Sequence, residues 1–191
     1  MCRTGLATLA IFYCDFRDKN KQNALNLLSS ILIQLCHQSD AYSQVLSSVY
    51  STHDEGFREP SIDALQECLR SMLKLPGQGA IYLVIDALDE CPNSSGYPTP
   101  REQVLDVMQA LINIQPVHVH FCIASRPEID IRDILEPLAT HNVPLHEQAG
   151  QSQDILDYIN HFVLSDRNAK RWREEDKKLV IETLTEKARG M

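Results

Sequence analysis

Three carboxylates that follow one hydrophobic run are the residues best placed to do chemistry in this sequence. The run Ile81–Ile85 is continuously hydrophobic, and Asp86, Asp89 and Glu90 follow it within a stretch of five residues. Such a run is typical of a β-strand that is covered on both faces, as in a parallel α/β sheet. Open α/β sheets bind their ligands beyond the carboxyl ends of the strands. We therefore expect these acids to line a ligand site.

Carboxylates at this position could hold a magnesium ion and orient a water molecule. Mg²⁺ binds through one or two carboxylates together with phosphate oxygens and water, and a neighbouring polar residue positions the nucleophile in phosphoryl transfer. The alternative is a buried strand whose polar end only meets solvent. Three crowded acids repel one another unless a cation or a donor lies among them, which favours the metal-binding interpretation.

A second polar group ends another hydrophobic run. The segment Val117–Ser125 reads as a strand, and Arg126 and Pro127 follow it. If this strand lies one crossover from the acidic one, Arg126 lies at the same sheet edge as Asp86 and could neutralise phosphate charge. An arginine before a proline can also be a plain surface residue. Its pairing with the acidic strand favours the functional interpretation.

Strands alternate with helices along most of the chain, which predicts an α/β domain with a parallel sheet. We expect the strands Leu6–Phe16, Ala80–Asp86 and Val117–Ser125, with Ala80–Asp86 in the middle, and a short run of strand character at Val143–Leu145. Helical periodicity is found at residues 23–37, 41–51, 61–75, 101–114 and 129–138. From residue 151 the periodicity is helical to the end. This pattern divides the chain into a sheet domain, 1–150, and a helical segment, 151–191.

Composition and charge exclude several classes of protein. The formal net charge is −8, which argues against a nucleic acid or an anionic membrane as a partner held by bulk electrostatics. No hydrophobic run approaches the roughly 20 residues that cross a bilayer. Six cysteines occur without a Cys-x-x-Cys pair, which is typical of a reduced intracellular protein. We therefore predict a cytoplasmic protein.

The motifs together resemble those of the NACHT branch of the STAND nucleotide-binding proteins, in the form common in fungi and related to the nephrocystin-like NACHT modules. The resemblance is carried by Tyr13–Asp18 (YCDFRD), Val84–Cys91 (VIDALDEC) and Ala124–Pro127 (ASRP), in this order. It implies a parallel, three-layer sheet like that of P-loop NTPases, followed by a small all-α segment.

The resemblance also implies a role for each polar residue at the sheet edge. Asp86 would bind Mg²⁺ as the acid of a Walker B strand, and Ser125 would lie beside the nucleotide. Asp89 and Glu90 would position the attacking water, and Arg126 would act as the sensor of the terminal phosphate. In the intact family the cofactors are Mg²⁺ with ATP or GTP.

The sequence departs from the family pattern at the phosphate-binding loop. No Gly-x-x-x-x-Gly-Lys-Ser/Thr motif occurs, although its backbone N–H groups and lysine normally grip the phosphates. We expect the chain to begin after that loop, so that the sheet lacks its first (Walker A) strand. We expect it to end inside the helical unit, before the repeats that commonly follow. The strand that ends in Ser125 should then expose an apolar edge.

Two functions are compatible with these sequence features. The first is part of a nucleotide-dependent switch in signalling or non-self recognition, without appreciable NTPase activity in this chain alone. The alternative is a degenerate, non-catalytic interaction module that binds no nucleotide and needs no cofactor. In both cases we expect protein partners or further copies of the chain, and neither nucleic acid nor membrane.

Overall fold

A computed structural model of the chain consists of two compact units, Met1–Ala139 and Thr140–Met191. The structure describes residues 7–52, 59–94, 96–114, 117–144, 151–167 and 169–188. The first unit is an α/β fold and the second is helical. The predicted fold class, an α/β domain followed by an all-α segment, is confirmed.

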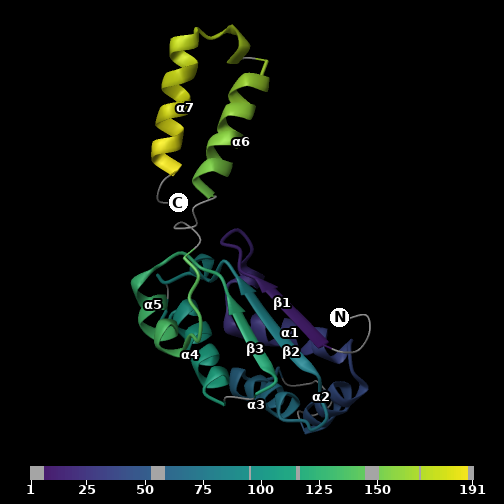
Figure 1. Cartoon of the computed structure of the whole chain (residues 1–191). Helices are drawn as coiled ribbons and strands as arrows, with labels where there is room; N and C mark the ends of the chain where they lie inside the picture. The colour runs from purple at the N-terminus through teal and green to yellow at the C-terminus, as the bar shows by residue number, and fades with distance from the viewer. Residues whose placement is uncertain are drawn as a thin grey trace. The chain divides into compact units, whose positions relative to one another are not determined.

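The sheet of the first unit has three parallel strands. They are β1 (Ala7–Tyr13), β2 (Ala80–Asp86) and β3 (Val119–Ile123), in the order β1-β2-β3, and Figure 1 shows them side by side. The predicted order, with Ala80–Asp86 in the middle, is confirmed. Tyr13 pairs with Asp86 in the register, and the Ala124 N–H, just after β3, donates to the Ile85 carbonyl at 2.9 Å. The carboxyl ends of all three strands therefore meet at one edge.

Only one face of the sheet is buried in the described part of the chain. Ile81, Leu83 and Ile85 belong to the hydrophobic core, whereas Tyr82 between them is 40% exposed. On the opposite face the Tyr82 ring stacks on the His120 ring of β3, with centroids 4.9 Å apart. The prediction that β2 is covered on both faces was wrong. Tyrosine makes the run look continuously hydrophobic, although its polar tip suits a wet surface.

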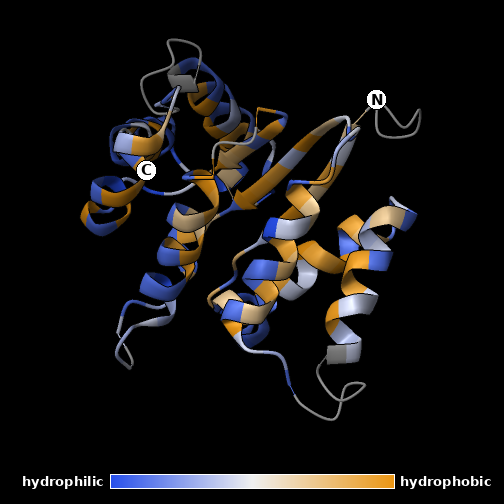
Figure 2. Cartoon of the chain, turned by 90° about the horizontal axis from the view of Figure 1, so that it is seen from below, coloured by the Kyte–Doolittle hydropathy of each residue, from blue (hydrophilic) through white to orange (hydrophobic). Residues whose placement is uncertain are grey.

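Helices α1 (Ala24–Cys36), α3 (Ile62–Leu73) and α4 (Pro100–Ile112) share the core with the buried face of the sheet. Their start positions are set by side-chain caps, because Asn23, Ser61 and Thr99 each accept a hydrogen bond from a first-turn N–H group. Helices α2 (Asp40–Thr52) and α5 (Ile129–Leu135) pack against this layer. The strands are coloured mostly as hydrophobic in Figure 2. The second helical layer of the implied three-layer arrangement is not found among the described residues of this unit.

The backbone groups of the two edge strands, β1 and β3, are bonded in different ways. Along β1, the Gln34 amide bonds both the N–H and the carbonyl of Ile11, at 2.9 and 2.8 Å. The Gln38 amide bonds Leu9 in the same way, at 3.1 and 2.7 Å. These two α1 side chains replace a neighbouring strand. The outer edge of β3 has no strand partner in the described part of the chain, and unpaired edges of this kind can recruit other strands.

The second unit contains α6 (Gln151–Ser165) and α7 (Glu174–Ala188) with a small core of Ile159, Val163 and Ala169. Phe162 of α6 is 57% exposed. The expected strand at Val143–Leu145 is not formed at Val143 and Pro144, and Leu145 lies outside the described residues. Proline lacks the N–H that a ladder needs. Among the described helices, none has the length and hydrophobicity of a membrane span.

Candidate functional site

The turn that follows β2 positions the acidic residues. Asp86 ends the strand, and its Oδ1 accepts the Ala87 N–H at 3.0 Å. Ala87 has φ 54° and ψ 45°, a left-handed conformation that costs a non-glycine residue about 1–3 kcal/mol and recurs at functional sites. A single 3₁₀ turn, Leu88–Glu90, follows. Leu88 is fully buried and its N–H donates to the Ala124 carbonyl at 3.1 Å, which anchors the turn next to the end of β3.

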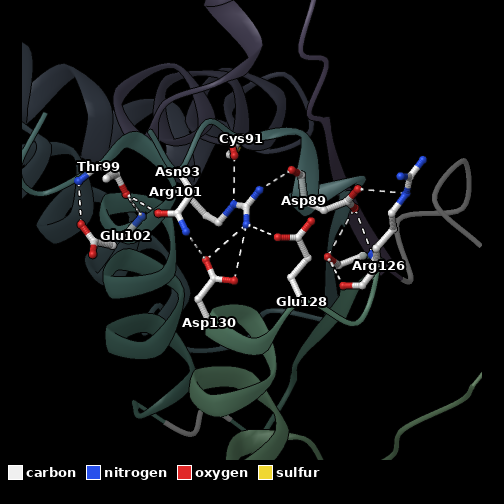
Figure 3. Close-up of polar contacts among 10 residues, drawn as sticks. Asp89, Cys91, Asn93, Thr99, Arg101, Glu102, Arg126, Glu128 and Asp130 are labelled. Atoms are coloured by element: carbon white, nitrogen blue, oxygen red, sulfur yellow. Dashed lines mark hydrogen bonds and ion pairs between the residues drawn. The ribbon is translucent and has the colours of Figure 1, made fainter. Parts of the chain in front are cut away.

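Asp89 joins the ends of β2 and β3. Its Oδ1 accepts the Arg126 N–H at 3.0 Å, and the Ser125 hydroxyl lies 3.4 Å from the same oxygen. The Arg126 Nε lies 3.5 Å from Asp89 Oδ2, and the Arg126 side chain is 81% exposed. Figure 3 shows the two residues facing one another. Three of the residues selected from the sequence therefore lie together.

Glu90 bonds the loop that follows β1. Its Oε2 accepts the N–H of Phe16, which follows β1, at 3.0 Å. Glu90 thus fastens the turn to the β1 side, while Asp89 fastens it to the β3 side. In the described ranges no three or more His, Cys, Asp or Glu residues form a group that could hold a metal ion. The three acids are spread along the sheet edge, each with its own partner.

Arg101, the second residue of α4, holds the turn from inside the molecule. Its Nε donates to the Cys91 carbonyl at 2.9 Å and its Nη2 to the Asp89 carbonyl at 2.6 Å. Its Nη1 bonds Glu128 at 2.7 Å and Asp130 at 3.2 Å, both at the start of α5. Figure 3 shows the guanidinium at the centre of these partners. Arg101 is only 6% exposed, so it links the acidic turn to the segment after β3.

The charge on Arg101 is maintained despite its burial. Burial works against the charged form, but the hydrogen bonds and negative charges of Glu128 and Asp130 outweigh it and raise the pKa of Arg101. Arg101 is not among the residues selected from the sequence. A signal existed, because Arg101 lies three and four positions before Val104 and Leu105 and therefore falls on the hydrophobic face of α4.

A chain of hydrogen bonds extends from Arg101 through Asp130 to the start of α4. Asn93 donates to Asp130 at 2.9 Å and accepts the Thr99 hydroxyl at 3.1 Å. Thr99 caps α4 and forms a capping box with Glu102. The start of α4 therefore carries both Arg101 and the residues that orient one of its acidic partners, so α4 and the acidic turn are positioned as one assembly.

A third arginine lies on the loop after β1. Arg17 bonds both carboxylate oxygens of Asp15, at 3.0 and 3.1 Å, and its side chain is 75% exposed. The hydrogen bonds from Arg17 lower the pKa of Asp15 to about 2. The same loop supplies the Phe16 N–H that Glu90 binds. All three strand ends thus contribute polar residues to this edge.

The residues at this edge include a carboxylate suited to Mg²⁺ but no loop suited to the phosphates of a nucleotide. Asp86 offers a carboxylate, the oxygen ligand that Mg²⁺ takes in proteins. The phosphates would need a glycine-rich nest of N–H groups and a lysine, and the 191 residues contain no such motif. The residues present could hold the metal side and contact a terminal phosphate, but they do not form a phosphate cradle.

The comparisons with known proteins support a NACHT-like N-terminal module, in which a parallel sheet carries acids after its middle strand and a serine–arginine pair after the next. The family model described as nephrocystin 3, N-terminal, matches residues 2–126, which is more than half of the chain. The chain belongs to this family.

The chain is also similar to the vegetative incompatibility protein HET-E-1 of Podospora anserina. The two are 28% identical over 160 residues, which cover 81% of this chain and 11% of HET-E-1. The chain thus spans a small part of the length of that relative. No solved structure matches the chain.

Proposed function

We propose that this chain is the acid-and-sensor part of a nucleotide-dependent conformational switch, acting in signalling or non-self recognition. The observation that carries the proposal is the contact of Asp89 with Arg126 and Ser125, which couples the ends of two parallel strands. Asp86 is the proposed Mg²⁺ ligand for ATP or GTP, and Asp89 and Glu90 are the proposed water-positioning acids.

The exposure of Arg126 suits an exchange of partners. An exposed ion pair contributes at most about 1 kcal/mol. The distance from Arg126 Nε to Asp89 Oδ2 is 3.5 Å, which is long for a hydrogen bond. Phosphate oxygens form shorter, charge-assisted hydrogen bonds with arginine. A terminal phosphate could therefore draw the Arg126 side chain away from Asp89. Asp89 would then be released toward a water molecule, which changes the turn that joins β2 to β3.

The similarity to HET-E-1 and the negative net charge support a role in recognition between proteins. HET-E-1 is named for vegetative incompatibility, and we propose a related signalling role for this chain in the cytoplasm. The net charge of −8 disfavours nucleic acid and anionic membranes. The proposed partners are other proteins or further copies of the chain.

One observation favours a second candidate, a non-catalytic interaction module that binds no nucleotide. Asp89 and Glu90 both have partners within the chain, at Arg126 and Phe16. Acids satisfied internally need no metal ion to relieve their repulsion. In this case the same contacts would serve only to hold three loops together.

A nucleotide titration with and without Mg²⁺ separates the two functions. For the switch part we expect a weak, Mg²⁺-dependent rise in melting temperature with ATP or GTP, which Asp86→Asn abolishes. The matched control is Asp106→Asn, an exposed acid on the outer side of α4, which should keep the rise. No rise with either nucleotide at millimolar concentration would favour the interaction module.

Hydrolysis is a separate measurement. Phosphoryl transfer depends on positioning and on charge stabilisation, and the phosphate loop that supplies both is absent from the sequence. We expect no appreciable release of phosphate from ATP or GTP by the chain alone. Steady turnover that is lost in Glu90→Gln would contradict this expectation.

A further inference from the structure

Two buried thiols touch one another beside the acidic turn. Cys14 follows β1 and Cys91 follows the turn after β2, and their sulfur atoms are 3.4 Å apart. Cys14 is 4% exposed and Cys91 is fully buried. They are 77 positions apart in the sequence, and no spacing motif pairs them. The contact is made by the parallel register of β1 and β2, which brings the two loops together.

Backbone hydrogen bonds hold both residues in place. The Cys14 N–H donates to the Asp86 carbonyl at 3.0 Å, and the Cys91 N–H donates to the Leu88 carbonyl at 3.1 Å. The Cys91 carbonyl accepts from the Arg101 Nε at 2.9 Å. Because both backbones are fixed, the sulfurs remain in contact unless the turn itself opens.

The surroundings make the two thiols unequal. The contact with Cys14 lowers the pKa of Cys91, and the positive charge of Arg101 acts in the same direction. Burial and the charges of Asp89 and Glu90 oppose this lowering of the pKa. The same contact, together with burial, raises the pKa of Cys14. The thiolate is the nucleophilic form of cysteine. Cys91 also lies beside the Arg101 guanidinium, which bonds its carbonyl at 2.9 Å, so we take Cys91 as the attacking sulfur and Cys14 as the sulfur that resolves the product.

We propose that Cys14 and Cys91 form a reversible redox pair, which a small peroxide converts into a disulfide. The Cys91 thiolate attacks one oxygen of hydrogen peroxide, the O–O bond breaks, and the hydroxide released takes up a proton to become water. The Cys14 sulfur then attacks the sulfenic sulfur, the S–S bond forms, and the S–O bond breaks to release a second water. Two thiols are oxidised and one peroxide is reduced.

Burial decides the class of oxidant. Cys14 is 4% exposed and Cys91 is fully buried, so the oxidant we propose is a small peroxide rather than a bulky disulfide such as oxidised glutathione. The sulfurs must approach from 3.4 Å to about 2.05 Å for the bond to form. The disulfide would tie the end of β1 to the turn that carries Asp89 and Glu90. In reducing compartments such bonds are transient and serve as redox sensors. The pair does not depend on nucleotide binding.

The test uses the full chain, purified under reducing conditions and then treated with a modest excess of hydrogen peroxide. After removal of the peroxide with catalase, the remaining thiols are alkylated and the chain is mapped by mass spectrometry without reduction. We expect one cross-linked peptide pair containing Cys14 and Cys91. We also expect a melting temperature higher by about 5 °C or more, because the bond closes a long loop. Dithiothreitol should reverse both changes.

Variants separate this pair from the other cysteines. Cys14→Ala should abolish the cross-link and leave a sulfenic acid at Cys91 that dimedone traps. Cys68→Ala, at an equally buried position in α3, should keep the cross-link. If the exposed Cys122 is fully oxidised while Cys14 and Cys91 stay alkylatable, the proposal is wrong. Separate sulfinic acids at the two positions would also overturn it. The map of the unmutated chain decides even if a variant fails to fold.

Discussion

Two arginines contact Asp89 in different ways. Arg101 is 6% exposed and donates to the Asp89 carbonyl, at 2.6 Å. The Arg126 side chain is 81% exposed and lies 3.5 Å from the Asp89 carboxylate. Arg101 bonds four groups, two from the turn after β2 and two from the start of α5, whereas the Arg126 side chain contacts one acid. The first arginine holds the turn from inside the molecule, and the second makes one longer contact at the surface.

The difference shows why the kind of contact matters more than the residue type. A buried charge that loses its partners is costly, so Arg101 cannot leave its site without unfolding the turn. An exposed arginine loses little when it moves, because water replaces its partner. If the proposed switch is right, Arg101 would be its rigid support and Arg126 its sensor.

The largest effect is expected from Arg101→Met. The change removes the donor of the Asp89 and Cys91 carbonyl groups. Each group left unsatisfied costs about 1–3 kcal/mol, so the two cost about 2–6 kcal/mol. The two acids that bond Arg101 at the start of α5 are partly exposed and add less. We expect a loss of this order in the free energy of unfolding, measured by urea denaturation. Arg132→Met, which removes an exposed ion pair on α5, should cost less than about 1 kcal/mol. Equal effects of the two changes would refute the assigned role of Arg101.

A smaller effect is expected from Asp130→Ala. This change removes one of the two acids that face Arg101 and frees the Asn93 amide, but Glu128 stays in place at 2.7 Å. A hydrogen bond to a charged group contributes about 1.5–3 kcal/mol, and the partial exposure of Asp130, 31%, reduces this. We expect a loss of about 1–2 kcal/mol by urea denaturation. A loss as large as that of Arg101→Met would place the critical contact at Asp130 instead.

Arg126→Ala tests the other half of the comparison. Because the side chain is exposed, we expect the free energy of unfolding to change by less than about 1 kcal/mol. If the proposed switch is right, the same variant weakens the Mg²⁺-dependent response to ATP more than the response to ADP, since only ATP has the terminal phosphate. Calorimetric titration with both nucleotides measures this difference. A strongly destabilised variant would show that Arg126 is structural.

The smallest effect concerns the exposed pair of Asp15 and Arg17. The pKa of Asp15 is lowered to about 2 in the folded chain, below the value of about 3.9 for an unfolded aspartate. Its contribution to stability is therefore fully present above about pH 4 and is lost as the pH falls toward 2. Comparison of Asp15→Asn with the unmutated chain should show a small difference in denaturation midpoint at pH 6. This difference should shrink at pH 2.5, and a difference that grows on acidification would contradict the assignment.

Several features could be predicted from the sequence because they depend on neighbours along the chain. The strands at β1, β2 and β3 follow from hydrophobic runs, and the start of α3 follows from the cap at Ser61. The meeting of Asp89 with Arg126 could also be predicted. Parallel strands bring their carboxyl ends to one edge, so residues after adjacent strands must lie close together, whatever the loops between them do.

Only the tertiary structure decided how the side chains at that edge are shared. The left-handed Ala87 turns Glu90 toward Phe16 and Asp89 toward Arg126, and an alanine gives no sequence signal for such a turn. The contact of Cys14 with Cys91 depends on a register that joins residues 77 positions apart. The sequence by itself determined which residues reach this edge, because strand period and order are local and topological properties. Packing in three dimensions determined which partner each of them bonds and which side chains are buried.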